Sequence, residues 1–408
     1  NMIETNVSFT DYGVRKIFPA GASSFIFPMG SDKKYTPVSF NVTANGNSTG
    51  SITVKPANEM HPSIVDDAEA VTPIVDKDNA LQYYWTLKGD GISGMDATAR
   101  MRYNDKDLKV TVPYTEADYH PASILTNASG KWLKFDQTYF DENNKELIFA
   151  FTNGGDAQLS GDYTAGAGDS NLDGAIPNQV SSYETVNSGN WTSESIWTPQ
   201  ISGGPRGAIV KINPLHTVDV SNNFLAGYQT EINGTLKLNS TNGHRLGIVK
   251  GVGTIYLEVG DIPAGDYHEF FSNTGGTLHF GGSTDYDMLG NVLEVNNLMF
   301  TGSGLRRLPN NNLSLNGNLT IDGTLSLLNY FNLQLSIKGN LVRTSGTFDA
   351  GSGATAILAF NGTLSQTIIG SFSNDNALNI IEINNSNGVG VDDDVEIGVN
   401  CSIDRAAL

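Results

Sequence analysis

A short sequence repeat constrains the fold of this chain most. This phrase returns about every 21 residues through the C-terminal half. The phrase reads small or polar, then Gly or Asn, then Thr or Asn, then Leu or Ile, as in residues 233–236. Its seven copies end at Leu236, Ile255, Leu278, Leu298, Leu319, Leu341 and Leu364. A fixed period of this size is typical of a solenoid, in which each turn buries its apolar side against the next.

Between the copies, apolar residues alternate with polar ones, as in residues 313–315 and 319–321. Alternation with period 2 indicates strands and not helices. We therefore predict that residues 186–408 form about ten coils of a right-handed parallel β-helix, since parallel crossovers are right-handed almost without exception. The seven final residues of the phrase are predicted to stack in one inward-facing column.

Two further details of the pattern carry predictions. Residues 313–322 align with residues 395–404, which matches Cys401 to Leu319 and predicts that the cysteine occupies a core position. A phrase at residues 322–325, Asp-Gly-Thr-Leu, falls outside the register. We interpret it as a chance product of a chain rich in Gly and Asn.

The composition excludes several classes of function. The net charge of −19 argues against nucleic-acid binding, which needs clustered Lys and Arg, and against adsorption to an anionic membrane. No apolar run is long enough to span a bilayer. The single cysteine rules out an internal disulfide framework but does not decide the compartment.

At 408 residues the chain is long enough for two or more domains. We predict an all-β chain in which residues 1–30 are the end of a preceding module with a lead-in strand. Residues 31–165 form an antiparallel β-sandwich, and residues 166–185 are a linker. The β-helix of residues 186–408 stops in the middle of a turn, so we expect the chain to be a fragment of a longer polypeptide.

The start of the predicted β-helix resembles a known class of proteins. Gly189-Asn-Trp191 is followed by Trp197-Thr-Pro, by His216-Thr-Val, and by the phrase at residues 233–236. These residues resemble the cap and first coils of modular surface proteins of Bacteroidota that use the type IX secretion route. Leu215 stands where those modules have Gly. The two tryptophans are predicted to cover the open end of the coil.

The resemblance implies an extracellular location at the bacterial cell surface. It also implies an export signal before residue 1 and a sorting domain after residue 408. The partners to expect are neighbouring modules of the same polypeptide and, beyond them, surface glycans or a secretion or motility apparatus.

A candidate metal site lies at the start of the linker. Asp169, Asn171 and Asp173 stand at positions 1, 3 and 5 of a Ca²⁺ loop, and Gly174 stands at position 6. Position 12, which should be a bidentate Glu, is Val180. Either a carboxylate from elsewhere completes a calcium site, or the segment is a flexible acidic linker that uses Asp, Asn and Gly for turns. No cofactor is required.

Other chemical groups are sparse. Asp392, Asp393 and Asp394 form an acidic run that we interpret as a solvated corner. Arg306 and Arg307 form the one basic doublet of the coil, and we expect no acidic residue at an aligned position one turn away. The six histidines form no pair with metal-ligand spacing.

Two functions fit these observations. The first is a non-enzymatic adhesin, stalk or filament segment that acts in attachment or surface motility. The second is a carbohydrate-binding or polysaccharide-degrading β-helix protein, because fold alone does not distinguish the two. We favour the first, since no acid, base and nucleophile converge in the sequence. A groove lined by acids, a base and aromatic platforms would favour the second.

Overall fold

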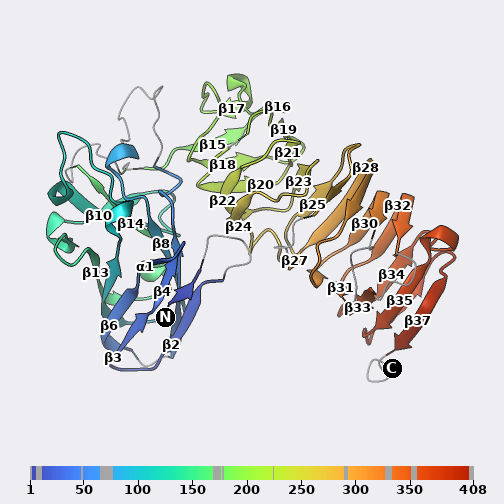
Figure 1. Ribbon diagram of the computed structural model, residues 1–408, viewed down its shortest axis with the longest axis horizontal. Helices are drawn as coiled ribbons and strands as arrows, with labels where there is room; N and C mark the ends of the chain where they lie inside the picture. Colours follow the sequence, from blue (N-terminus) through green and yellow to red (C-terminus); the bar gives the residue numbers. More distant parts are fainter. Residues whose placement is uncertain are drawn as a thin grey trace. The chain divides into compact units, whose positions relative to one another are not determined.

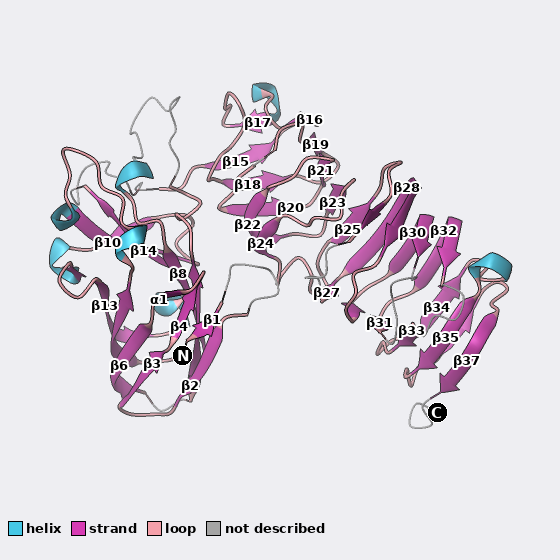
Figure 2. Ribbon diagram, in the orientation of Figure 1, coloured by secondary structure: helices cyan, strands magenta, loops and turns pink. Residues whose placement is uncertain are grey.

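The structure is a computed structural model that describes residues 2–5, 12–46, 49–64, 77–168, 176, 179–223, 225–288, 293–326, 333–350 and 356–403. Strands dominate it, and its helices are short (Figure 2). The chain divides into two compact units. The first comprises Asn1–Ser182 with Arg206–Ile209, and the second comprises Tyr183–Pro205 with Val210–Leu408.

Two antiparallel sheets and one small sheet form the first unit. The six-stranded sheet has the order β11 (Trp132–Lys134), β10 (Tyr119–Leu125), β14 (Gly161–Ala167), β8 (Tyr84–Asp90), β7 (Gly50–Ala57), β2 (Val14–Phe18). The five-stranded sheet has the order β12 (Phe140–Asp141), β13 (Glu146–Gly154), β9 (Met95–Arg102), β6 (Val38–Asn45), β3 (Ser23–Phe27). The small sheet contains β1 (Ile3–Glu4), β4 (Met29–Ser31) and β5 (Lys34–Tyr35). The short helices of the first unit are η1 (Lys77–Asn79), η2 (Asp105–Asp107), η3 (Glu116–Asp118), η4 (Gln137–Tyr139) and α1 (Asp156–Leu159).

One hydrophobic core lies between the two larger sheets. It takes alternate residues from strands of both, such as Val38 and Phe40 of β6 and Trp85 and Leu87 of β8. The period of 2 places these side chains on one face of each strand, where they lose contact with water. Trp85 is fully buried and donates its indole N–H to the Thr36 carbonyl oxygen (3.3 Å).

The predicted boundaries of this unit were partly wrong. Residues 14–18 and 23–27 do not belong to a preceding module, because β2 pairs with β7 and β3 pairs with β6. The physical reason is that Phe18 and Phe27 end these strands inside the shared core. At the other end, β14 continues to Ala167 and lies between β10 and β8.

The second unit is a coil of parallel strands (Figure 1). One sheet, here the long sheet, runs along it with the order β16 (Gly189–Asn190), β19 (Thr217–Asp219), β21 (Thr235–Asn239), β23 (Thr254–Leu257), β25 (Thr277–Phe280), β28 (Asn297–Arg307), β30 (Leu319–Ser326), β32 (Leu341–Asp349), β34 (Gln366–Ile369), β36 (Val389–Val391), with β26 (Tyr286–Asp287) beside β28. The first short sheet contains β17 (Trp197–Thr198), β15 (Ser182–Thr185), β18 (Ile209–Ile212), β20 (Gln229–Ile232), β22 (Arg245–Lys250) and β24 (Ala264–Asp266). The second short sheet contains β27 (Glu294–Val295), β29 (Leu313–Leu315), β31 (Gln334–Ile337), β33 (Ile357–Phe360), β35 (Leu378–Ile383) and β37 (Ile397–Ile403). Two short helices, η5 (Glu194–Ile196) and η6 (Asn374–Asn376), complete the unit.

The parallel β-solenoid makes about 8 turns over residues 209–402, fewer than the ten predicted. Part of the difference is the segment before it, where β15 and β17 pair antiparallel and do not form a coil. Trp191 and Trp197 lie there with ring centroids 5.0 Å apart, and both are buried. The indole N–H of Trp197 donates to the Trp191 carbonyl oxygen (2.8 Å).

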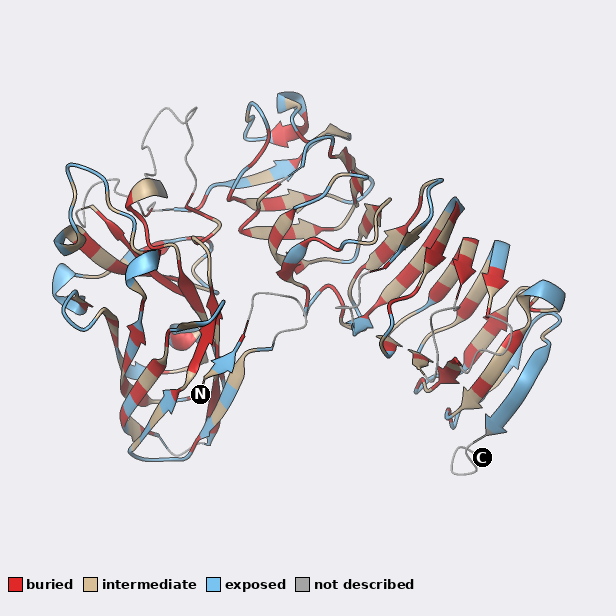
Figure 3. Cartoon of the chain, viewed as in Figure 1, coloured by how far each residue is buried: buried red, intermediate tan, exposed pale blue. Residues whose placement is uncertain are grey.

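Six of the seven residues predicted to form the inward column do so. Leu236, Ile255, Leu278, Leu298, Leu319 and Leu341 pair in register on successive strands of the long sheet, and each is at most 1 % exposed. Figure 3 shows the resulting alternation of buried and half-buried residues along these strands. The column extends by one strand at its start, where Val218 pairs with Leu236.

The seventh residue, Leu364, was predicted wrongly. Its side chain is 77 % exposed, and Ile368 pairs with Leu341 in its place. A buried glutamine explains the shift. Gln366 accepts a hydrogen bond from the Gly362 N–H (2.8 Å) and donates to the Ile337 carbonyl oxygen (2.8 Å). The phrase is thereby folded into a turn, and β34 begins after it.

The interpretation of the Asp-Gly-Thr-Leu phrase at 322–325 as chance was also wrong. Gly302, Gly323 and Gly346 pair in register on β28, β30 and β32. They form a glycine column that is separate from the glycines of the repeated phrase, at a place where the register of the strands shifts. A Cβ on Gly346, whose φ is +71°, would lie 2.0 Å from the Gly323 carbonyl oxygen. Only glycine allows coils to stack so closely at this corner. Leu325 then enters the core between its neighbours on β28 and β32.

Cys401 does not occupy the predicted core position. It is exposed, and it pairs with Ile381 in the second short sheet, whereas Leu319 belongs to the long sheet. In its second half, the apparent repeat between residues 313–322 and 395–404 therefore aligned positions of different sheets. Among the described strands, β37 has β35 as its one neighbour, and Figure 3 shows most of it as exposed.

Candidate functional site

The outer face of the long sheet carries two columns of side chains. The polar column consists of Thr217, Thr235, Thr254, Thr277 and Asn297, paired in register on five successive strands. The mixed column consists of Asp219, Lys237, Tyr256, His279 and Met299 on the same strands. All ten side chains are half-buried. Successive members of a column are about 4.8 Å apart, because each coil adds one strand spacing.

Asparagine side chains continue the polar column and join the coils. The Asn297 side-chain oxygen accepts from the Asn318 N–H (2.9 Å), and that of Asn318 accepts from the Asn340 N–H (2.8 Å). Asn340 accepts in the same way from the Thr367 N–H (2.9 Å). These bonds satisfy backbone donors at the turns, where the sheet ladder has ended. They explain why these three copies of the phrase have Asn at the third position.

The mixed column brings a cation and two rings together. The Lys237 Nζ lies 5.5 Å from the centre of the Tyr256 ring and 3.7 Å from an Asp219 oxygen. The Tyr256 and His279 rings meet edge to face with centroids 4.8 Å apart. The His279 Nε2 lies within hydrogen-bond distance of the Thr301 hydroxyl (2.8 Å). Edge-to-face contacts of this kind fix the ring orientations.

Partial burial keeps both rings uncharged at neutral pH. It raises the pKa of the Tyr256 hydroxyl to about 12, assisted by the hydrogen bond that this hydroxyl donates to Glu258 (2.9 Å). Burial lowers the pKa of His279 below its ordinary value. The face therefore combines hydroxyl and amide groups with two neutral rings, groups that can stack on and hydrogen-bond to a polar uncharged ligand.

The two arginines of the basic doublet differ in burial, and Arg306 is not accessible to a substrate. Arg306 is fully buried and lies over the Tyr286 ring (4.7 Å), and it donates to the carbonyl oxygen of Gly282 (2.7 Å). Arg307 donates to Asp287 (2.8 Å) on the neighbouring strand. The expectation that no aligned acid lies one turn away was therefore wrong. A guanidinium inside the coil supports the bend of the chain and cannot reach a substrate.

A serine, a histidine and an aspartate meet in the first unit, and no motif in the sequence indicated this cluster. The His61 Nδ1 lies 2.8 Å from the Ser63 hydroxyl, and its Nε2 lies 3.1 Å from the Asp162 carboxylate. His61 is fully buried, between the rings of Tyr84 and Trp132. Ser63 is only 5 % exposed, so a substrate has no access to its hydroxyl. The cluster ties a loop to the sheet.

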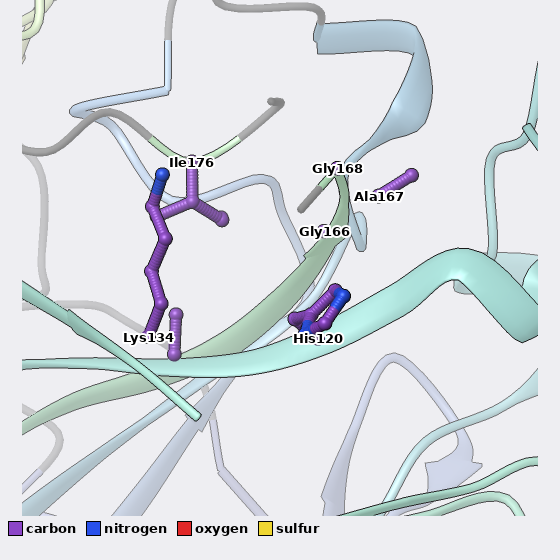
Figure 4. A pocket seen from close by; sticks show the side chains of 7 residues that line it. His120, Lys134, Gly166, Ala167, Gly168 and Ile176 are labelled. Carbon is purple, nitrogen blue, oxygen red and sulfur yellow. The ribbon is translucent and has the colours of Figure 1, made fainter. Parts of the chain in front are cut away.

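The predicted calcium ligands Asp169, Asn171 and Asp173 lie outside the described residues. The residues at either end of that stretch help to form a small pocket, lined by His120, Ala122, Lys134, Gly166, Ala167, Gly168 and Ile176 (Figure 4). None of these described lining residues carries a carboxylate, and the His120 Nδ1 donates to the Phe135 carbonyl oxygen (3.0 Å). The described part of the lining therefore offers no carboxylate ligand to a cation.

Removal of divalent cations is expected to leave the melting temperature of each unit nearly unchanged, because the Ca²⁺ loop lacks its bidentate Glu. Thermal unfolding of the purified chain with EDTA, compared with added Ca²⁺, measures this. Addition of Ca²⁺ after EDTA controls for effects of the chelator itself. A large drop that Ca²⁺ restores would show that a distant carboxylate completes the site.

The acidic run contains the last of the residues singled out in the sequence. Asp392, Asp393 and Asp394 are all exposed, as expected for a solvated corner. Within the described ranges, no group of three or more His, Cys, Asp or Glu side chains is placed to hold a metal ion. No helix in that part of the chain has the length and apolar character needed to cross a membrane.

No protein-family model, curated protein or solved structure matches this chain.

Proposed function

We propose that this chain is a non-enzymatic segment of an extracellular surface protein, an adhesin or stalk that contacts glycans through the outer face of its long sheet. The observation that carries the proposal is the polar column, a row of Thr and Asn side chains in register along five strands. A repeated row of weak donors and acceptors suits multivalent contact, where linked weak sites raise avidity.

The neighbouring mixed column supports a glycan as the ligand. Its two rings, Tyr256 and His279, are uncharged and half-buried, and Lys237 and Asp219 lie beside them. Aromatic rings can pack on the apolar faces of sugars while their polar tips remain hydrogen-bonded. The buried Arg306 gives no support to the alternative of polysaccharide cleavage.

The resemblance to type IX surface proteins supplies the rest of the proposal. It supports a location at the cell surface of a bacterium, in series with neighbouring modules, and a role in attachment or surface motility. We also take the first unit to be a β-sandwich and the coil to be right-handed, as parallel crossovers are elsewhere.

Replacement of Tyr256 and His279 together by Ala is expected to weaken glycan binding about tenfold, or ~1.4 kcal/mol. The measurement is retention of the purified chain on a panel of immobilised polysaccharides, followed by titration of the best binder. Tyr139→Ala is a matched control, because Tyr139 is 38 % exposed but lies in the first unit. Binding to no glycan, or equal losses in both variants, would contradict the proposal. Release of shorter chains from any bound polysaccharide would contradict its non-enzymatic part.

A further inference from the structure

Three side chains from distant parts of the first unit converge at one partly enclosed place. Lys34 lies in β5, Asn58 directly follows β7, and Asp107 ends η2. The Lys34 ammonium donates to the Asn58 side-chain oxygen (2.6 Å) and to one oxygen of Asp107. The Lys34 side chain is 20 % exposed, and that of Asp107 is 1 % exposed.

The backbone holds Lys34 and Asp107 in place. Asp32 and Lys33 adopt positive φ angles in the tight turn that leads into Lys34. The Asp107 N–H donates to the Asn104 carbonyl oxygen (2.8 Å), and its own carbonyl accepts from the Gln82 N–H (2.7 Å). The site is therefore preorganised by a hairpin and a capped helical turn.

The orientation of the Asn58 amide is also fixed. Its Nδ2 donates to the Asp32 carboxylate (3.2 Å), so its oxygen faces the Lys34 ammonium. With a C=O bond of about 1.23 Å, the Lys34 Nζ lies at most about 3.8 Å from the Asn58 carbonyl carbon. This is near the separation of reacting atoms in a conformer ready for attack.

The two carboxylate oxygens of Asp107 differ in their contacts. Its second carboxylate oxygen is buried and has no hydrogen-bond partner among the described residues. Burial raises the pKa of the Asp107 carboxyl above its ordinary value, although the Lys34 ammonium opposes this. A carboxyl in such a place readily takes a proton from its neighbour, because two neutral groups cost less to bury than two charges.

We propose that Lys34 and Asn58 form an intramolecular isopeptide bond, with Asp107 as the catalytic residue that transfers the protons. A proton moves from the Lys34 Nζ to Asp107, and the neutral amine attacks the Asn58 carbonyl carbon. The Nζ–Cγ bond forms and the Cγ–Nδ2 bond breaks. A second proton from Nζ reaches Nδ2 through Asp107, so that Nδ2 leaves as ammonia.

The atoms of this step balance without any other reactant. The third Nζ proton becomes the hydrogen of the new amide, and the first remains on Asp107. The Asp32 carboxylate beside Nδ2 stabilises positive charge on the leaving nitrogen. The product replaces a buried ion pair by neutral groups and links two positions 24 residues apart. Such a link restricts the unfolded chain and so stabilises the fold.

Intact-protein mass spectrometry of the purified chain tests the proposal. The mass is expected to be lower than the sequence mass by one molecule of ammonia. Proteolysis should then release a branched peptide that joins Lys34 to Asn58. Succinimide formation at an asparagine also releases ammonia, so the branched peptide decides between the two. The full sequence mass in the parent chain, or ammonia loss without the branched peptide, would overturn the proposal.

Matched variants distinguish loss of the isopeptide bond from a general effect of substitution on the fold. Lys34→Arg keeps the positive charge beside Asp107 but offers no amine, and Asp107→Asn removes the proton carrier. Both are expected to show the full sequence mass and a lower melting temperature. Lys88→Gln is the control, because Lys88 is an exposed lysine of β8 in the same unit. It should retain the ammonia loss and the branched peptide. A branched peptide in Lys34→Arg, or its loss in Lys88→Gln, would contradict the assignment.

Discussion

Replacing Leu319 with Asp is expected to lower the free energy of unfolding of the coil by at least ~3 kcal/mol, the usual scale for an uncompensated buried charge. Leu319 is 0 % exposed and pairs with Leu298 on one side and Leu341 on the other. A carboxylate there would have neither water nor a partner cation. Denaturant-induced unfolding of the purified chain, followed by circular dichroism, measures the loss.

Leu364→Asp is the matched control for this substitution. Both leucines end a copy of the same phrase, so the repeat alone predicts equal losses. Because Leu364 is 77 % exposed, its substitution should change the free energy of unfolding by less than about 0.5 kcal/mol. Equal losses in the two variants would show that the last phrase lies in the inward column after all.

Trp197→Ala is expected to lower the free energy of unfolding of the second unit by about 3–5 kcal/mol, the range for truncation of a buried aromatic residue. Trp197 is 1 % exposed, packs against Trp191, and lies in β17, the end strand of the first short sheet, where we predicted a cap. Its loss leaves a cavity at the end of a structure whose turns are stabilised mainly by their neighbours. Hydrogen exchange should show the largest loss of protection in β18 and β19, the strands nearest the cap.

Trp197→Phe separates packing from hydrogen bonding at the same position. It keeps most of the ring but removes the donor to the Trp191 carbonyl oxygen, which should cost only about 1 kcal/mol. If Trp197→Ala were no worse than Trp197→Phe, the cap would contribute little to the stability of the coil.

The sequence predicted the inward column because each coil repeats one local rule, a Gly or Asn turn followed by an alternating strand. It failed where a distant residue changes the local outcome. Leu364 leaves the column because Gln366 bonds to both the preceding coil and the turn. The glycine corner was missed because Gly302, Gly323 and Gly346 belong to a second phrase, which is a different part of the same coil.

The candidate sites were less predictable than the fold for the same reason. Tyr256 and His279 stand 23 residues apart, and only the register of the coils makes them neighbours. Lys34, Asn58 and Asp107 are farther apart still and come from a hairpin, a strand end and a helical turn. No periodicity connects such positions, so they emerge only from the assembled core.

The two faces of the solenoid differ in continuity, and this has a mechanical consequence. The long sheet runs without interruption from β16 to β36, whereas the strands on the other side separate into two sheets, one ending at β24 and the next beginning at β27. Stretching the long sheet would break ladder hydrogen bonds, but opening the gap between the short sheets breaks none among the described strands. The solenoid should therefore resist bending that stretches the long sheet and yield to bending that opens the gap between the short sheets. Its flexural axis should lie close to β25.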